Sequence, residues 1–233
     1  MAELEVIGPE DRLFATSTSL FNRLNGRSSD QLLRHAHVRG YSKGEFIFRT
    51  GEDPQFAYVV LSGCVALTGH SDEGRNTVVE FLEPGECFAL APVALDKPYL
   101  LSARAATEIR LLHIEAERVR ALIQSNHEFS ISMVEILSHH WRQLVEQITD
   151  LKLKSSAQRL GGYLLTLAKG PSSSDVRLPS ERQLVAARLG MTPESLSRAF
   201  ARLRQLGVIG HGQTVVVKDA KRLRAFCEGR DQS

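Results

Sequence analysis

The chain has 233 residues, enough for one large domain or two smaller ones, and 24% of them are charged. The net charge of +2 is unevenly distributed: residues 1–150 hold 14 Lys and Arg against 21 Asp and Glu, and residues 151–233 hold 15 against 6. Only the second part is therefore expected to meet a polyanion. No apolar run reaches the roughly 18 residues that span a bilayer, and the acidic start does not resemble a signal peptide. We expect a cytoplasmic protein without a membrane partner.

The three cysteines, Cys64, Cys87 and Cys227, are odd in number and far apart. Their spacing fits neither a disulfide framework nor a CxxC metal or redox site. We expect them to act as small buried hydrophobic residues.

The first elements are two short helices within residues 11–36, separated near Gly26. From about residue 38 to 114, short β-rich runs alternate with glycine turns, which predicts a compact antiparallel barrel or roll. The segment 72–75, Asp-Glu-Gly-Arg, predicts a hairpin connection. The expected strands are Glu45–Phe48, Ala57–Leu61, Val65–Thr68, Val78–Phe81 and Ile109–Ile114.

A short helix is predicted at 115–125, followed by a long helix from about His127 to Lys152. Two apolar sets lie side by side on the long helix, which indicates that it is buried against two surfaces. The first set has heptad spacing and is expected to form a dimer seam with a second copy of the chain. Its members are Met133, Leu137, His140, Leu144, Gln147 and Leu151. The second set is Val134, Ile136, Trp141, Val145 and Ile148. The alternative is a helix that packs only on its own domain.

The last third of the chain predicts a winged helix-turn-helix. A helix at 155–168, a loop and a short strand at 176–178 precede a helix at 183–189, which Gly190 ends. Thr192 caps the next helix, which begins at Pro193 and runs to about Leu206. Strands at 208–209 and 214–217 would form the wing, and a helix at 219–227 closes the chain.

The outward face of the helix after Thr192 carries residues suited to DNA. Glu194 can accept from cytosine, Arg198 can bond guanine through two hydrogen bonds, and Ser197 can contact a base edge. Ser180, Thr192, Ser195 and Arg202 are expected at phosphates, which position the protein without specifying sequence. Alternatively, Glu194 and Arg198 could simply form an ion pair on a solvated face. That reading does not explain the local charge, because residues 180–224 hold 9 Lys and Arg against 3 Asp and Glu.

From about residue 20 to 225 the chain resembles the CRP/FNR family of bacterial regulators. The segments 43–52 and 58–65 resemble the family's cyclic-nucleotide-binding β-roll, and the long helix resembles its dimerisation helix. The pattern Glu194-x-x-Ser197-Arg198 matches the recognition signature of the FNR branch. The resemblance implies a homodimer on double-stranded DNA, at a palindrome of the type TTGAT–four bases–ATCAA, with RNA polymerase as a further partner. The segment 153–168 is most similar to the branch of nitric-oxide-responsive denitrification regulators.

The departures from the family concern the effector. An iron-sulfur cluster needs four thiolates, usually three of them near the N-terminus, and the first 60 residues hold no cysteine. The family's cyclic-AMP pocket needs a Gly-Glu pair and an Arg-Ser pair, where this chain has Phe88, Ala89 and Leu90, then Leu101, Ser102 and Ala103. Leucines there would leave the phosphate unpaired, so cyclic AMP is not expected in this effector pocket, residues 88–90 with 101–102.

Haem is the remaining cofactor that the family offers, and it needs only one axial histidine. His139 and His140 on the long helix are weak candidates, and His140 could instead be a polar residue that sets the helix register. The eight histidines are His35, His37, His70, His113, His127, His139, His140 and His211.

We therefore expect an α+β fold with a cyclic-nucleotide-binding-type β-roll (jelly roll) at 1–125, a dimerisation helix at 126–152 and a winged helix-turn-helix domain at 153–233. The helix-turn-helix itself would cover about 182–201. The expected function is transcription regulation by sequence-specific DNA binding under control of a small effector or of haem and nitric oxide. One alternative is a cyclic-nucleotide-binding module acting on a protein partner, which would lack a recognition helix. The other is an enzyme, for which no catalytic motif is present.

Overall fold

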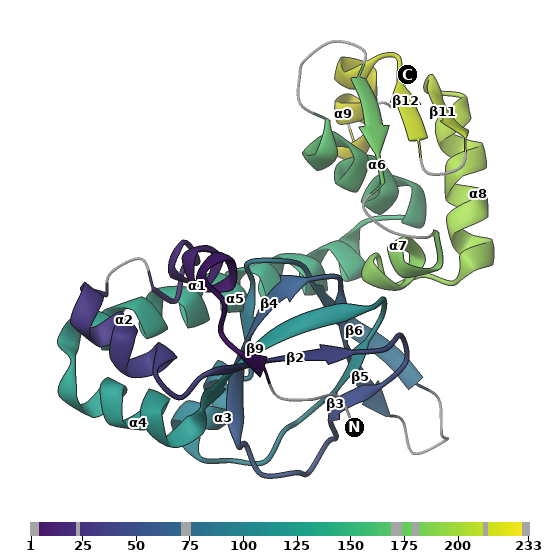
Figure 1. Cartoon of the computed structure of the whole chain (residues 1–233). Helices are drawn as coiled ribbons and strands as arrows, with labels where there is room; N and C mark the ends of the chain where they lie inside the picture. The colour runs from purple at the N-terminus through teal and green to yellow at the C-terminus, as the bar shows by residue number, and fades with distance from the viewer. Residues whose placement is uncertain are drawn as a thin grey trace. The chain divides into compact units, whose positions relative to one another are not determined.

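The computed structural model describes residues 5–21, 24–70, 76–168, 174–178, 182–211 and 214–229. The chain forms two compact units, residues 1–142 and 143–233, and the boundary falls inside the long helix α5 (His127–Leu153) (Figure 1). Each unit has its own hydrophobic core. Within the described ranges, no helix combines the length and the apolar character that crossing a membrane requires.

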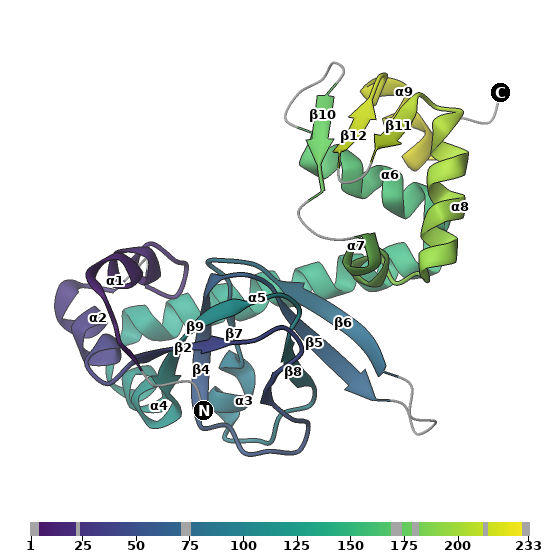
Figure 2. The ribbon, with the colours of Figure 1, turned by 45° about the vertical axis from the view of Figure 1, so that its right-hand side comes forward.

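The first unit contains two antiparallel sheets that form a β-roll (Figure 2). In the five-stranded sheet the order is β1 (Glu5–Val6), β2 (His37–Tyr41), β9 (Ile109–Glu115), β4 (Phe56–Ser62) and β7 (Cys87–Phe88). In the four-stranded sheet it is β3 (Phe46–Phe48), β8 (Ser102–Ala105), β5 (Val65–His70) and β6 (Asn76–Leu82). The expected α+β fold with an N-terminal β-roll is confirmed.

Four of these strands, β1, β2, β7 and β8, were not expected from the sequence. In β2, His-Val-Arg-Gly-Tyr, polar and apolar residues mix without the β-branched run that marks a strand. Pairing with β9 makes this segment a strand, from His37 opposite His113 to Tyr41 opposite Ile109. The predicted hairpin at 72–75 lies outside the described residues, between the paired strands β5 and β6.

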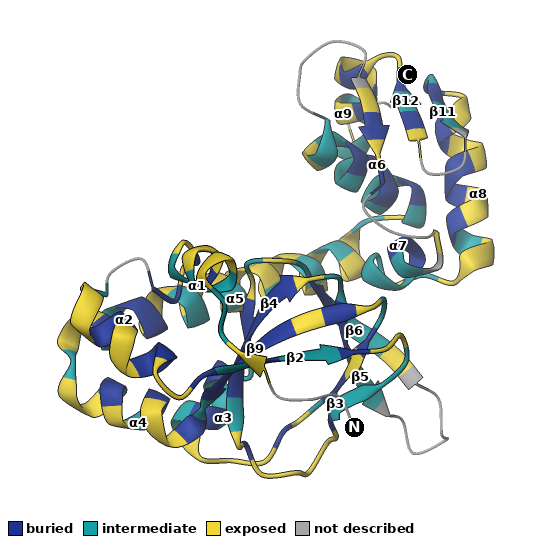
Figure 3. Cartoon of the chain, viewed as in Figure 1, coloured by how far each residue is buried: buried dark blue, intermediate teal, exposed yellow. Residues whose placement is uncertain are grey.

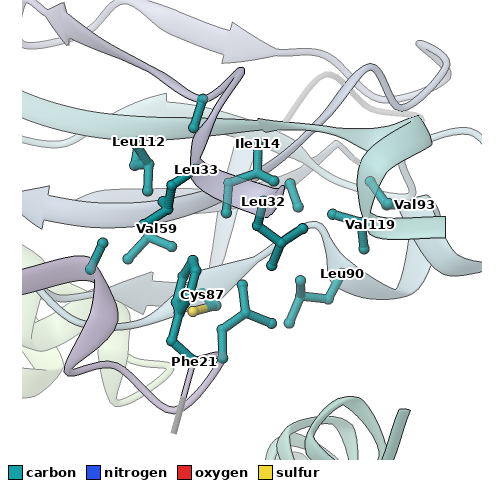
Figure 4. Close-up of a cluster of buried hydrophobic side chains, with 14 of the residues drawn as sticks. Phe21, Leu32, Leu33, Val59, Cys87, Leu90, Val93, Leu112, Ile114 and Val119 are labelled. Carbon is teal, nitrogen blue, oxygen red and sulfur yellow. The ribbon is translucent and has the colours of Figure 1, made fainter. Parts of the chain in front are cut away.

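Alternating side chains of β4 and β9 point to two different cores. Val59 and Leu112 face the helical side, where they pack with α1 (Pro9–Thr16), α2 (Gly26–Leu33), α3 (Leu90–Leu95) and α4 (Ala116–Ser125). Figure 4 shows this cluster, with Phe21, Leu32 and Leu33 against Val59 and Leu112. Tyr58 and Leu111 face the opposite side and belong to the core inside the roll. The central strands β4 and β9 are therefore buried on both faces of the sheet.

The long helix packs on its own domain through the apolar set that was expected to form the dimer seam. Met133 is buried, Leu137 is half-buried against the helical core, and His140 bonds Glu80 of β6. Met133 is therefore taken up by the core of its own chain and does not fit a dimer contact, whereas Leu137 and His140 keep some exposed surface and their place in a dimer seam stays a prediction. Leu144 and Gln147 are half-buried, and Leu151 is exposed. Heptad spacing indicates that a residue is buried, but it does not indicate whether the covering surface belongs to the same chain or to a second copy.

The exposed apolar face of α5 is instead the neighbouring set. Val134, Trp141, Val145 and Ile148 are all exposed, and Trp141 exposes 68% of its surface. Steps of seven, four and three residues between them place all four on one stripe of the helix. Ile136, which the sequence grouped with them, packs against the helical core instead.

The second unit packs four further helices with a three-stranded sheet in the order β10 (Ser174–Arg177), β12 (Thr214–Val217) and β11 (Val208–His211). The helices are α6 (Ser156–Leu167), α7 (Arg182–Arg188), α8 (Pro193–Arg204) and α9 (Ala220–Cys227). A capping box starts α6, since Ser155 accepts from Gln158 N and the Gln158 side chain accepts from Ser155 N. Figure 3 shows the buried residues of α6 and α8 turned toward one another. Within the described ranges, these elements match the predicted winged helix-turn-helix.

Candidate functional site

A tight turn joins α7 to α8 in the second unit. Gly190 has a φ of +60°, a left-handed conformation that favours glycine. The Met191 N–H donates to Ala186 O at 3.0 Å and closes the turn. Ala186 of α7 and Leu196, Phe200 and Leu203 of α8 are buried together. This core holds α8 against α7 and leaves the opposite face of α8 free.

The N-terminus of α8 is capped by Thr192. Its hydroxyl accepts from Ser195 N at 3.2 Å, and Pro193 occupies the first turn, where a missing N–H costs nothing. The helix dipole favours a negative charge at this end. Such an end suits a DNA phosphate.

The solvent-facing side of α8 carries the residues that the sequence assigned to base contacts. Glu194, Ser197 and Arg198 are exposed, and so is Arg202. Ser197 Oγ donates to Pro193 O at 3.0 Å, and Arg198 Nη2 donates to Ser195 Oγ at 3.0 Å. The structure thus places Glu194, Ser197 and Arg198 together in the first two turns of a single helix face.

Glu194 and Arg198 do not form the ion pair considered as the alternative to DNA contact. Both residues are described, and the Arg198 guanidinium hydrogen-bonds Ser195 instead. The pKa of Glu194 is lowered by hydrogen bonding to its own backbone N–H and to Thr192, with a smaller contribution from Arg198. Glu194 is therefore ionised and can accept a hydrogen bond.

The residues expected at phosphates are only partly brought together. Thr192 and Ser195 meet at the start of α8, with their hydroxyl oxygens 3.3 Å apart. Arg202 lies two turns further along and donates to Gln205 Oε1 at 2.6 Å. Ser180 lies outside the described residues.

The effector pocket expected at residues 88–90 and 101–102 is not formed as predicted. Phe88 is buried in the core inside the roll, whereas Leu90 is buried in the helical core on the other side of the sheet. Ser102 is buried, and its hydroxyl accepts from Thr50 N at 3.0 Å. Ala89 has a φ of 61° at the start of α3, so the chain turns there and sends its neighbours to opposite cores. These residues therefore do not line one common cavity.

A different cavity of about 290 Å³ lies in the roll, where β2, β4 and β9 meet the segments before β4 and β8. We call it the roll cavity. It is lined mainly by aromatic rings, which the sequence analysis did not group together. They are His37, Tyr41, Phe48, Phe56, Tyr58, Tyr99 and His113. Alternation in His37-Val38-Arg39-Gly40-Tyr41 could have indicated a shared face, had this segment been recognised as a strand.

His113 is at the centre of the roll cavity's ring cluster. Its ring stacks on His37 with centroids 4.7 Å apart, and Phe56 and Tyr58 meet it edge-on at 5.2 and 4.9 Å. Its Nε2 lies 3.1 Å from Tyr41 Oη, a hydrogen bond in which either group can donate. Burial lowers the pKa of His113 to about 3, and burial also lowers the pKa of His37. Both imidazoles are therefore neutral at pH 7.

The two candidate haem ligands do not fit an axial role. His140 Nε2 lies 2.8 and 2.9 Å from the two carboxylate oxygens of Glu80 and is thus already bonded. His139 is exposed on the surface of α5. Neither histidine presents a free nitrogen to an enclosed apolar space, which an axial ligand requires.

Two family models match the chain. Residues 38–126 match the cyclic nucleotide-binding domain, and residues 158–226 match the Crp-like helix-turn-helix domain. The first match contains most of the roll, and the second contains α7, α8 and the wing strands. A recognition helix is thus present, contrary to what a cyclic-nucleotide-binding module acting on a protein would require.

Known proteins similar to the chain share both parts. A crystal structure from Ruegeria pomeroyi DSS-3, described as a candidate cyclic nucleotide binding protein, is 34% identical, covers 93% of this chain and 96% of its own, and has a TM-score of 0.63. DNR from Pseudomonas aeruginosa is 28% identical, covers 94% and 99%, and has a TM-score of 0.53. The cAMP-activated global transcriptional regulator CRP of Haemophilus influenzae is 27% identical over 82% of this chain and 88% of its own. With this coverage and both domain types in order, the chain belongs to the CRP/FNR family of DNA-binding transcription regulators.

Proposed function

We propose that the protein binds an FNR-type palindrome, TTGAT–four bases–ATCAA, through α8 of two copies of the chain. The observation that carries this proposal is the joint exposure of Glu194, Ser197 and Arg198 on one face of a capped helix. Their chemistry matches cytosine, a base edge and guanine in the major groove. Thr192 and Ser195 at the helix N-terminus would bind a neighbouring phosphate.

A palindromic site requires a two-fold dimer, and we assign its contact to the exposed face of α5. Val134, Trp141, Val145 and Ile148 form a stripe of large apolar side chains that the chain itself leaves in solvent. Pairing two such stripes would remove them from water. The two α8 helices would then enter successive major grooves about 34 Å apart.

Control by a ligand in the roll would act as a population shift between two dimer states. We propose that the ligand is not cyclic AMP, because Leu90 is buried in the helical core and the Ser102 hydroxyl is bonded to Thr50. Haem is not supported by the positions of His139 and His140 either, so we assign no role to it. RNA polymerase remains a proposed partner.

The test compares the wild-type protein with Arg198→Ala by fluorescence anisotropy on the palindrome and on a scrambled duplex. We expect wild type to prefer the palindrome, and the substitution to cost about 1–3 kcal/mol on it and to relax the choice at the guanine. Arg204→Ala is the matched control, because Arg204 is also an exposed arginine of α8 but lies on another side of the helix. Equal wild-type affinity for both duplexes would contradict the proposed site.

A further inference from the structure

The roll cavity contains a buried imidazole nitrogen without a hydrogen-bond partner. His113 is 4% exposed, and its Nε2 is engaged with Tyr41 Oη. Its other ring nitrogen, Nδ1, is buried and has no partner. Leaving a buried polar atom unpaired is destabilising, so unpaired atoms are rare in natural protein cores. One reason for such an atom is a ligand that supplies the missing bond.

A second unpaired polar atom belongs to the same cavity. Arg39 lies two residues from both His37 and Tyr41 on β2, and its Nε is buried without a partner. The rest of its guanidinium is engaged: Nη2 lies 3.3 Å from Glu45 Oε1, and the group covers the Tyr41 ring at 4.6 Å. An Arg Nε–H can only donate. Two residues that line the cavity therefore hold one obligatory donor and one imidazole nitrogen that the chain leaves unpaired.

The charge of the lining argues against an ionic ligand. Glu52 and Asp53 also line the cavity, so its lining holds two carboxylates and the single cation of Arg39, and a ligand anion would meet net negative charge. A ligand cation would face the Arg39 N–H, which needs an acceptor. Several ring faces that could bind a cation are already covered, Phe48 by Tyr99 at 3.6 Å and Tyr58 by Phe88 at 4.9 Å. An uncharged ligand fits this lining best.

The size and the polar atoms of the cavity further restrict the class of ligand that fits. A volume of about 290 Å³ is at the lower end of small-molecule sites, which suits a single aromatic ring among the aromatic side chains. A hydroxyl group both donates and accepts, so it can pair with Nδ1 in either tautomer of His113 and accept from Arg39 as well. A carbonyl could match only one tautomer.

We infer that the roll cavity binds a small uncharged aromatic molecule that carries a hydroxyl group, such as a simple phenol, with the hydroxyl bonded to His113 Nδ1 and Arg39 Nε. The cavity belongs to the first unit and α8 to the second. Binding measured without DNA therefore tests this inference separately from the proposed DNA site.

The experiment follows the imidazole nitrogens of the ¹⁵N-labelled full-length protein by NMR during titration with phenol. Toluene, benzoate and phenyltrimethylammonium serve as comparators of similar size that lack the hydroxyl or carry a charge. We expect saturable shifts of the His113 nitrogens with phenol and about tenfold weaker binding of toluene, the equivalent of one net hydrogen bond. Benzoate and the cation should bind more weakly than phenol.

Variants at His113 and at a control position test which residue produces the preference for phenol. His113→Phe keeps a ring but removes Nδ1, so the preference for phenol over toluene should fall, whereas His35→Phe, at an exposed histidine outside the cavity, should keep the full preference for phenol. If His113→Phe does not fold, Arg39→Met, which removes the Nε–H donor, should reduce the preference instead. The inference is overturned if wild type shows no saturable phenol shift at His113, if it binds toluene as well as phenol, or if either ion binds more tightly.

Discussion

The hydrogen bonds between His140 and Glu80 show how a single contact changes the interpretation of a residue. By spacing, His140 belongs to a seam and could have been a haem ligand. In the structure its Nε2 bonds both carboxylate oxygens of Glu80, which attaches α5 to β6 of the same roll. No property of the helix sequence alone indicates a carboxylate 60 residues earlier in the chain.

The same pair predicts a pH-dependent stability. The hydrogen bond to Glu80 raises the pKa of His140 above its ordinary value of 6.5, although burial opposes this. A raised folded-state pKa means that the stabilisation is fully present below pH 6.5 and is lost as the pH rises through the folded-state value. We expect His140→Gln to lower the free energy of unfolding more at pH 6 than at pH 9. Urea denaturation at both pH values measures this, and an equal loss at both would contradict it.

At Gly63 the structure shows how little space a side chain would have. It has a φ of +80°, and a Cβ added there would lie 2.1 Å from the Glu108 carbonyl oxygen. We expect Gly63→Ala to destabilise the protein by about 3 kcal/mol or more, since left-handed strain and a backbone clash add. In the control Gly51→Ala, φ is +86° but no atom lies within 4 Å, so only the strain of about 1–2 kcal/mol should appear. Similar losses for both, measured by urea denaturation, would exclude the clash.

At the scale of elements, α5 shows what a heptad pattern can and cannot predict. The pattern correctly indicated a long helix with two apolar sets of residues. It did not indicate that Met133 and Leu137 of the heptad set pack against the chain's own helical core. Both sets are largely apolar in sequence, and the packing of the helix on the roll distinguishes them.

The exposed stripe of α5 gives a prediction about assembly. We expect Trp141→Glu to weaken dimerisation by about 2 kcal/mol or more, because it places a charge at the centre of the proposed interface. Leu100→Glu is the control, since Leu100 is 87% exposed in the roll and lies off the helix. Sedimentation velocity should show a monomer for the first variant over concentrations where wild type and the control are dimeric. A dimer that survives Trp141→Glu unchanged would place the contact elsewhere.

The recognition helix α8 is the element that the sequence predicted most completely. The Thr192 cap, Pro193 in the first turn and the alternation of buried and exposed positions are local features, and each appears in the structure. Such local features can be predicted from the sequence because positions on one face of a helix recur every 3.6 residues.

At the scale of the whole molecule, acidic residues are in excess in the first unit and basic residues are in excess in the second. We predict that DNA affinity falls steeply as the salt concentration rises. Only basic residues of the second unit should contribute to the steepness of this fall. We expect Arg202→Ala to reduce the slope of log affinity against log salt concentration by about 1. Arg118→Ala, an exposed arginine of α4 in the first unit, should leave the slope unchanged. Anisotropy titrations at several salt concentrations measure both, and an equal change for the two variants would contradict the division.

The sequence by itself determined the fold class, the order of the parts and the exposed residues of α8. Each of these rests on neighbours within a few positions along the chain. It did not determine the strand β2, the partner of His140, the face of α5 left in solvent or the roll cavity. Those depend on segments as distant as His37 and His113, which only strand pairing brings together. Long-range pairing leaves no local periodic signal, so the tertiary structure alone decided where the unpaired Nδ1 of His113 would lie.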